Sequence, residues 1–227
     1  MRILYAQHLD LSLRAGFNRF FNREVKQDII DMTRVSIKST LKFYSDIHLY
    51  VDIDSYQYFD DLPVTLHELK TLPEIFCGAK LEVLKDQKDL DFIWVDPDIF
   101  ISSPFDIDYT KSFMVDKSTK LDDMYYERLS YFSKEYPKYE MVGDWLNSGL
   151  LWFRDTDVME YHIKLYEELL TLSTDARIVE SWNISHCGKK FGYGKFNHTK
   201  TQYLHFDGYK KFFDVSKNMI KGLEKLL

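Results

Sequence analysis

Short hydrophobic runs alternate with longer amphipathic segments along the first half of the chain. Apolar runs at residues 1–6, 47–51 and 92–95 predict strands, and the last of these reads as a buried central strand. Residues 25–44 predict a helix, because apolar side chains recur there on one stripe: Ile30, Ile37, Leu41 and Tyr44. Strand, helix and strand therefore alternate from the start, which favours an α/β fold with parallel strands.

The same alternation continues towards the C-terminus. Pro73 suits a first helical turn and predicts a helix that ends near Lys85. Asp155 or Thr156 caps a further helix, whose apolar positions repeat at helical spacing: Val158, Tyr161, Leu165, Leu169 and Leu172. The remaining predicted elements are short strands at 112–115, 150–153 and 203–206, a helix at 176–186 and a loop at 188–200.

Two segments of the sequence each allow two interpretations. Residues 122–140 are aromatic and charged, which fits an amphipathic helix over one face of the sheet or a flap whose rings bind sugars. The predicted C-terminal helix is basic and amphipathic, so it either packs on the domain or makes peripheral contact with a membrane. Its apolar side chains are Val215, Met219, Ile220, Leu223 and Leu226.

Composition narrows the class of protein. A chain of 227 residues with 45% hydrophobic residues predicts one domain with one core. A net charge of −6 argues against a dedicated nucleic-acid binder, which usually carries a basic face. Cys77 and Cys187 match no metal-binding spacing and are predicted to be buried, reduced thiols. With no run long enough to span a membrane and no signal peptide, we expect a cytoplasmic protein.

The candidate chemistry centres on Asp96-Pro97-Asp98, directly after the apolar run at 92–95. Proline cannot donate to a strand ladder, so the strand is expected to end at Pro97. Both carboxylates then lie at the carboxyl edge of the sheet, where open α/β sheets bind ligands. Paired aspartate oxygens suit Mn²⁺ or Mg²⁺, which usually keep phosphate oxygens as further ligands.

The same Asp-x-Asp spacing occurs at four other places, which are expected to be caps, turns or solvated loops. They are Asp52/Asp54, Asp89/Asp91, Asp106/Asp108 and Asp155/Asp157.

Four further stretches single out Asp96 and Asp98, and each has a simpler structural interpretation as well. Asp144-Trp145-Leu146-Asn147-Ser148-Gly149 precedes a predicted strand and is either a sugar-binding stretch or a capped turn. His205, with Asp207, Gly208, Lys210 and Lys211 after it, is either a metal ligand or an ordinary strand-end histidine.

The other two stretches are single side chains on predicted helices. Lys80 lies on the helix before the aspartate pair, where a lone lysine is usually solvated. Glu180, in Glu180-Ser181-Trp182-Asn183, is otherwise an ordinary surface carboxylate.

These stretches resemble the motifs of GT-A fold glycosyltransferases, in particular the glycogenin-like and lipopolysaccharide galactosyltransferase-like enzymes of family eight. Asp96-Pro97-Asp98 resembles their Asp-x-Asp motif, and Asp144 to Gly149 resembles their Asp-x-Phe-Asn-Ser-Gly stretch. His205, Gly208 and Lys211 match their His-x-x-Gly-x-x-Lys motif, and Lys80 stands at the offset of their donor-site Lys or Arg. The chain departs from the family where Phe212-Phe213 replace Pro-Trp and Glu180-Ser181 replace Asp-Gln.

The resemblance implies a single GT-A domain over 1–227, with a mixed, mainly parallel sheet between helices. Residues 1–101 or so would form the nucleotide-binding half, and about 102–227 the half for donor sugar and acceptor. The implied metal ligands for Mn²⁺ or Mg²⁺ are Asp96, Asp98 and His205. The implied donor-binding residues are Gln7, His8, Asp10, Lys80, Asp96, Asp98, Asn147, Ser148, Gly208 and Lys211. Asp144, Asn147 and Glu180 are the implied residues around the reacting sugar.

The expected reaction moves a hexose from a UDP-sugar, such as UDP-glucose or UDP-galactose, to a hydroxyl of a glycan or lipid-linked acceptor, with retention. Three alternatives stay open. A metal-dependent phosphohydrolase of nucleotide sugars uses the same metal but needs a base that activates water. A non-catalytic module would only bind the sugar nucleotide. The third alternative is a glycosyltransferase whose acceptor is a modified base in DNA, and the acidic charge balance argues against it.

Overall fold

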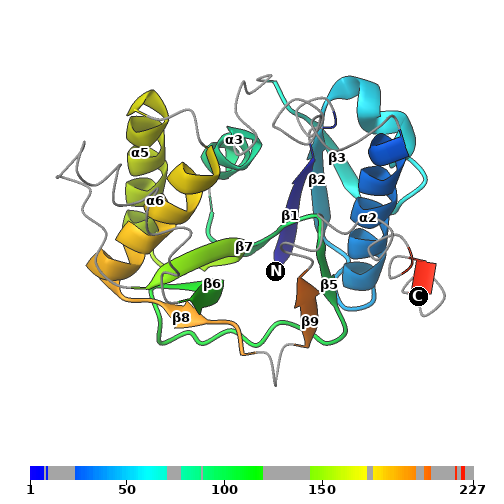
Figure 1. Ribbon diagram of the computed structural model, residues 1–227. Helices are drawn as coiled ribbons and strands as arrows, with labels where there is room; N and C mark the ends of the chain where they lie inside the picture. Colours follow the sequence, from blue (N-terminus) through cyan, green and yellow to red (C-terminus); the bar gives the residue numbers. More distant parts are fainter. Residues whose placement is uncertain are drawn as a thin grey trace. The chain divides into compact units, whose positions relative to one another are not determined.

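The computed structural model describes most of the chain as two compact units (Figure 1). The first unit comprises Met1–Asp86, Asp91–Asp106 and Asn197–Leu227, and the second comprises Gln87–Leu90 and Ile107–Phe196. The fold is α/β, with mixed but mainly parallel strands flanked by helices, as the alternating pattern predicts. The described residues are 1–7, 9, 24–70, 78–87, 89–119, 144–172, 176–197, 202–205, 218 and 221–222.

Four parallel strands form the sheet of the first unit, in the order β3-β2-β1-β4. They are β1 (Arg2–Gln7), β2 (Ile47–Val51), β3 (Thr65–Glu68) and β4 (Phe92–Val95). All of β4 is buried, and most of β1 and β2, which explains why their sequences are continuous apolar runs. β3 was not predicted, because this short strand is half-exposed and carries polar side chains.

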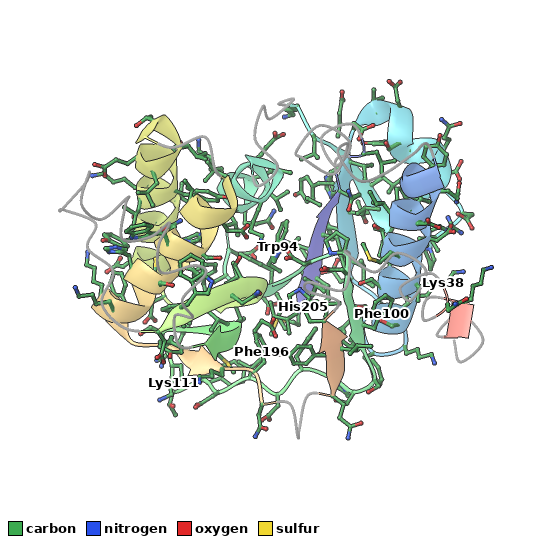
Figure 2. All side chains as sticks on the ribbon, viewed as in Figure 1. Lys38, Trp94, Phe100, Lys111, Phe196 and His205 are labelled. Atoms are coloured by element: carbon green, nitrogen blue, oxygen red, sulfur yellow. The ribbon has the colours of Figure 1, made fainter. Side chains whose placement is uncertain are left out.

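Among the described residues of the first unit, two α-helices pack on its strands. α2 (Glu24–Leu41) packs against β5, where Figure 2 shows Phe100 beside the helix, and α3 (Gly78–Asp86) packs against β1. A short 3₁₀ helix, η2 (Ile53–Tyr58), follows β2. The buried face of α2 carries hydroxyl groups as well as aliphatic side chains, and Ser39 Oγ accepts a hydrogen bond from the backbone N–H of Ile101 at 3.1 Å. Pro73 lies outside the described residues.

A two-stranded antiparallel ladder in the first unit determines where His205 lies. β5 (Ile99–Ile101) follows the aspartate pair directly, and β9 (Tyr203–His205) pairs with it. The register sets Ile99 opposite His205, so the histidine at the end of β9 comes next to Asp98. The sequence predicted β9 but not β5, which is only three residues long.

The described part of the second unit contains three strands and two long helices. The strands run in the order β7-β6-β8, with β6 (Phe113–Thr119) antiparallel to β7 (Trp145–Phe153) and parallel to β8 (Gly194–Lys195). α5 (Thr156–Leu172) and α6 (Ala176–Phe191) pack on each other, and α6 packs on β7. The stripe predicted for α5 is therefore core, as Val158, Leu165 and Leu169 show.

The loop predicted at 188–200 is wrong in its first part, where α6 continues to Phe191 and β8 follows. Gly188 suggested a loop, but it is helical and allows α6 to approach β7. A Cβ there would lie 2.6 Å from Leu146 Cδ1. The helix is followed by Gly192, whose φ of 72° is accessible to glycine at little cost.

Several predictions fall wholly or partly outside the described residues. They concern the segment 122–140, the C-terminal helix and Cys77. Cys187 is free and buried as predicted, and burial raises the pKa of its thiol to about 12. No helix in the described part of the chain is long and apolar enough to cross a bilayer.

Candidate functional site

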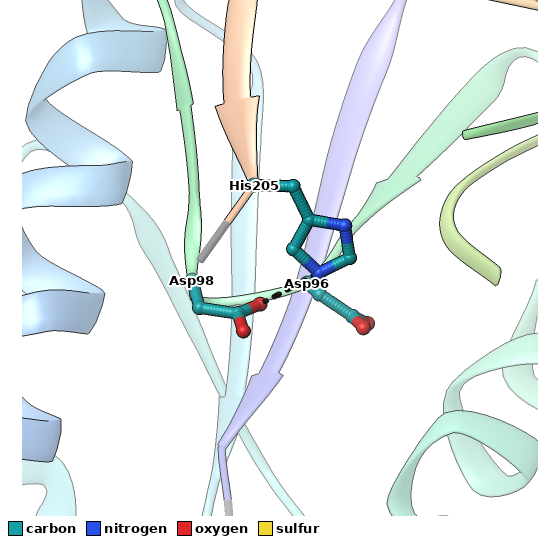
Figure 3. A group of neighbouring side chains, drawn as sticks. All are labelled: Asp96, Asp98 and His205. Carbon is teal, nitrogen blue, oxygen red and sulfur yellow. Dashed lines mark ion pairs between the residues drawn. The ribbon is translucent and has the colours of Figure 1, made fainter. Parts of the chain in front are cut away.

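Asp96, Asp98 and His205 form a cluster where β4 ends and the β5–β9 ladder begins (Figure 3). β4 stops at Val95, and a turn closed by the Ile99 N–H on the Asp96 carbonyl oxygen at 3.1 Å follows. One ligand atom from each of the three side chains lies within 4.8 Å of the others. His205 Nε2 lies 3.5 Å from Asp98 Oδ1. The structure thus brings together three residues that the sequence named as metal ligands.

The chemistry of this cluster fits a divalent cation. Asp98 is only 2% exposed, and a buried carboxylate is costly unless a cation or hydrogen-bond donors compensate its charge. Two carboxylates and one imidazole are a mixed oxygen and nitrogen donor set, which suits Mn²⁺ and accepts Mg²⁺ less well. Among the residues that the structure describes, this is the one group of three or more His, Cys, Asp or Glu side chains close enough to hold a metal.

Lys80 joins the cluster through Asp96. Its ammonium lies 3.2 Å from Asp96 Oδ1 and 4.9 Å from the centre of the Trp94 ring. The interpretation of Lys80 as a solvated helix residue is wrong, because the residue is only 5% exposed. A lysine this buried needs a counter-charge, and Asp96 supplies it. The indole Nε1–H of Trp94 donates a hydrogen bond to the same carboxylate oxygen at 2.7 Å.

Gln7, one of the implied donor-binding residues, lies at the end of β1. It is the last residue of that strand and is buried, one position beyond the strand predicted at 1–6. The strand continues to Gln7 because Gln7 pairs with Val51 of β2. Leu9 N–H donates to Asp52 Oδ1 at 3.1 Å, and Ser55 Oγ donates to Asp52 Oδ2. The Asp52 side chain therefore links the backbone just after β1 to the 3₁₀ helix that follows β2, which is a structural role.

The stretch from Asp144 to Gly149 belongs to the second unit and corrects a prediction. It was expected before a strand, yet β7 already begins at Trp145, because the segment pairs with β6 through Asn147 and Lys117. Asn147 Oδ1 accepts the Gly149 N–H at 2.8 Å. Just before the strand, exposed Asp144 accepts a hydrogen bond from the hydroxyl of Tyr193 at 2.6 Å.

Glu180 lies on α6 and is linked to the same strand. Ser148 Oγ donates a hydrogen bond to Glu180 Oε1, so two of the predicted residues are in contact. Ser185 Oγ of the same helix accepts the Leu146 N–H at 2.9 Å, which fixes α6 against β7. Glu180 is therefore hydrogen-bonded to the neighbouring strand and is not an isolated surface carboxylate.

Sequence reasoning missed two of the side chains that touch predicted site residues. Trp94 stands two positions before Asp96 in a strand, and this spacing places two side chains on one face, so the contact could have been found. Tyr193 reaches Asp144 only through the fold of α6 and β8, which leaves no local signal. His8, Asp10, Gly208 and Lys211 lie outside the described residues and stay predictions.

Comparison of the whole chain with known proteins gives structural matches only. No protein-family model matches the sequence, and no curated protein matches it either. An active-site mutant of LgtC, a galactosyltransferase, superimposes with a TM-score of 0.50 at 15% identity, covering 87% of this chain and 73% of that one. The glycosyltransferase GlyE of Streptococcus pneumoniae TIGR4 gives 0.50 at 12% identity. That alignment covers 87% of this chain but only 45% of GlyE.

The chain has the GT-A fold. This fold is also that of a nucleotidyltransferase, the inositol-1-phosphate CTP transferase of T. maritima, which matches with a TM-score of 0.51 at 11% identity. That comparison covers 99% of this chain and 96% of the other. Identities this low show a shared fold alone, and one fold can carry different chemistries.

Proposed function

We propose that the chain is a metal-dependent glycosyltransferase that moves a hexose from UDP-glucose or UDP-galactose to a hydroxyl acceptor. The observation that carries the proposal is the Asp96, Asp98 and His205 cluster at the end of β4, with Lys80 paired to Asp96. Two carboxylates and a histidine form a cation site of the kind a diphosphate can share. In an open α/β sheet, this edge is the expected place for a nucleotide.

In this reaction the bond between the anomeric carbon and the diphosphate breaks, and the acceptor oxygen bonds to the same carbon while its proton is released. A cation bound by Asp96, Asp98 and His205 would neutralise charge on the departing diphosphate. The first unit supplies the remaining proposed nucleotide contacts. Gln7, His8 and Asp10 are the proposed contacts with the base, from the resemblance in motifs, and the Lys80 ammonium lies beside Asp96 of the cation site. Lys211 adds a positive charge towards the phosphates.

Asp144, Asn147 and Glu180 are the residues proposed around the sugar. Asp144 and Asn147 hydrogen-bond sugar hydroxyls, and such positioning alone can lower a barrier by several kcal/mol. Glu180 is our candidate for the side chain near the anomeric carbon, and its contact with Ser148 limits the directions in which the carboxylate can point. We further propose retention of configuration and a glycan or lipid-linked acceptor, from the resemblance in motifs.

A nucleotidyltransferase is the second candidate, favoured by the full-length match to the CTP transferase. Such an enzyme joins a nucleoside triphosphate to a sugar phosphate and releases pyrophosphate, so it also needs a divalent cation. The two functions differ in the products that they release, which makes them separable in one set of assays.

The deciding experiment incubates the purified chain with Mn²⁺ and a panel of sugar nucleotides, with and without glycan, glycolipid and hydroxymethylated DNA acceptors. Parallel reactions contain CTP or UTP with sugar phosphates. Acceptor-dependent release of UDP supports the glycosyltransferase, and the anomeric configuration of the product, read by NMR, tests retention. Asp98→Asn is the inactive control. Release of sugar phosphate without acceptor would identify a hydrolase, and pyrophosphate release would identify a nucleotidyltransferase.

A further inference from the structure

The buried indole of Trp94 forms a hydrogen bond that no part of the proposed reaction uses. Its Nε1–H donates to Asp96 Oδ1 at 2.7 Å, and the residue is 2% exposed. Trp94 belongs to β4 and Asp96 follows that strand, so alternate side chains point to the same face. Figure 2 labels Trp94 and His205 at the centre of the view.

The same carboxylate oxygen also meets Lys80. The ammonium lies 3.2 Å from Asp96 Oδ1 and above the face of the Trp94 ring, 4.9 Å from its centre. Two donors of different kinds therefore converge on Oδ1. A lysine ammonium carries three donors on a flexible stem, whereas an indole has one N–H in a fixed direction on a packed ring.

Because of this difference, the two donors affect the orientation of the Asp96 carboxylate differently. A carboxylate paired only with an ammonium can rotate until both of its oxygens face the positive charge, and it then competes poorly for a second cation. The indole N–H opposes that rotation, because turning the carboxylate would break a buried hydrogen bond. Trp94 thus stabilises the orientation in which Asp96 Oδ1 faces the indole and the Lys80 ammonium.

We propose that Trp94 is a positioning residue for the cation site, which holds the Asp96 carboxylate with Oδ1 on the indole and Lys80 and directs Oδ2 to the cation. The inference rests on the metal site of the proposed function but not on sugar transfer. Hydrogen-bonding partners of metal ligands commonly change metal affinity by about 10–100-fold when they are removed.

NMR of the wild-type chain tests the contact without any enzymatic reaction. The chain has four tryptophans, so a ¹⁵N-labelled sample gives four indole N–H signals. The Trp94 signal, identified by its absence from Trp94→Phe, is expected to shift on titration with Mg²⁺ and to broaden first with Mn²⁺. The other three signals are expected to stay nearly constant. The proposal would be overturned if none of the four indole signals changed with Mg²⁺ or with Mn²⁺.

Affinity for Mn²⁺ alone, measured by EPR of the free ion, gives the second readout. Trp94→Phe keeps an aromatic ring under Lys80 but removes the N–H, and is expected to weaken Mn²⁺ binding by about 10–100-fold. Trp152→Phe, a buried tryptophan of β7, is the matched control and is expected to bind Mn²⁺ like the wild type. Equal affinities of Trp94→Phe and wild type would contradict the proposal.

The outcomes separate this inference from the proposed function. If Trp94→Phe weakens Mn²⁺ but the wild type transfers no sugar, the positioning role stands and the glycosyltransferase does not. If transfer occurs but Trp94→Phe binds Mn²⁺ normally, the positioning role fails. Should Trp94→Phe not give a cooperative melt, triple-resonance NMR of the wild type assigns the Trp94 indole signal, and its response to the cation still decides.

Discussion

His205 Nε2 lies 3.5 Å from Asp98 Oδ1, because the pairing of β9 with β5 places His205 opposite Ile99, the residue after Asp98. Two segments far apart in the sequence thus contribute to one cluster through a ladder of three residue pairs. Loss of either side chain is expected to affect metal binding far more than folding.

The first prediction concerns Asp98→Asn, which keeps the shape of the side chain and removes its charge. Mn²⁺ affinity is expected to fall by at least about tenfold, since the cation loses a unit charge in direct contact. Isothermal titration with Mn²⁺ measures the effect. The matched control is Asp60→Asn, the same change at an exposed position, which should leave affinity unchanged. A collapsed melting curve for Asp98→Asn would instead show that the buried carboxylate is structural.

The second prediction concerns Lys80→Met, which keeps the buried chain length and removes the ammonium beside Asp96. Without that competing charge, Mn²⁺ alone is expected to bind about tenfold more tightly, whereas UDP in saturating Mn²⁺ should bind more weakly. Titrating Lys80→Met with Mn²⁺ alone and with UDP in saturating Mn²⁺ measures the expected gain in the first affinity and the expected loss in the second. Lys85→Met, exposed at the end of the same helix, is the control. Weaker binding of both ligands would mean that Lys80 maintains the shape of the site and does not compete with the cation.

Asp144 carries the third prediction. If it binds sugar hydroxyls, Asp144→Ala should weaken UDP-glucose or UDP-galactose by about 1.5–3 kcal/mol and leave UDP unaffected. Tyr193→Phe removes only the hydrogen bond that holds Asp144, at 2.6 Å, so a smaller loss with the same selectivity is expected. Calorimetry with the sugar nucleotide and with UDP makes the comparison. An equal loss for both ligands would assign Asp144 to the structure of the strand end.

The parts of the fold that the sequence predicted are those with a strong local pattern. β1, β2 and β4 are predominantly apolar because they are predominantly buried, and α2 and α5 show helical stripes. β3, β5 and β8 are short or polar, and such strands form only because a neighbour supplies hydrogen-bonding partners. Gly188 shows the opposite error, since a loop signal in the sequence reflects close packing of α6 on β7.

The candidate site likewise has features that the sequence predicted and features that it did not. Asp96 and Asp98 follow a buried strand, so their position at its end could be predicted from the chain alone. The contact of Ser148 with Glu180 depends on how α6 packs against β7, which no local pattern encodes. The burial of Lys80 was missed for a similar reason, because its counter-charge and its aromatic neighbour come from another element.

The last prediction concerns pH and an imidazole pair away from the proposed site. His48 Nδ1 and His67 Nε2 lie 2.7 Å apart on β2 and β3, and His48 Nε2 lies 2.9 Å from Asp46 Oδ1. The short contact requires one proton between the two rings. The pKa of His67 is lowered, first by desolvation and then by the charges of His48 and Arg2, with Asp86 acting in the opposite direction.

The sign of the effect follows from proton linkage. The unfolded chain protonates His67 near its ordinary pKa of about 6.5, and the folded chain only at lower pH. Between these two values the unfolded state binds more protons, so the contribution of His67 to stability is present above about pH 6.5 and declines as pH falls. His67→Gln retains a donor towards His48 but cannot titrate. Its free energy of unfolding is therefore expected to fall less than that of the wild type between about pH 7 and pH 5.5.

Urea unfolding at a series of pH values measures this difference, because carboxylates titrate equally in both proteins and cancel. The imidazole shifts of His67 give an independent check, since its titration midpoint should lie below the ordinary value. The prediction would be contradicted if the free energies of unfolding of the wild type and His67→Gln changed in parallel with pH and His67 titrated at its ordinary midpoint. The His48–His67 pair would then accept a second proton without loss of stability. In that case the two rings separate on protonation, and the contact between β2 and β3 contributes nothing to the pH dependence.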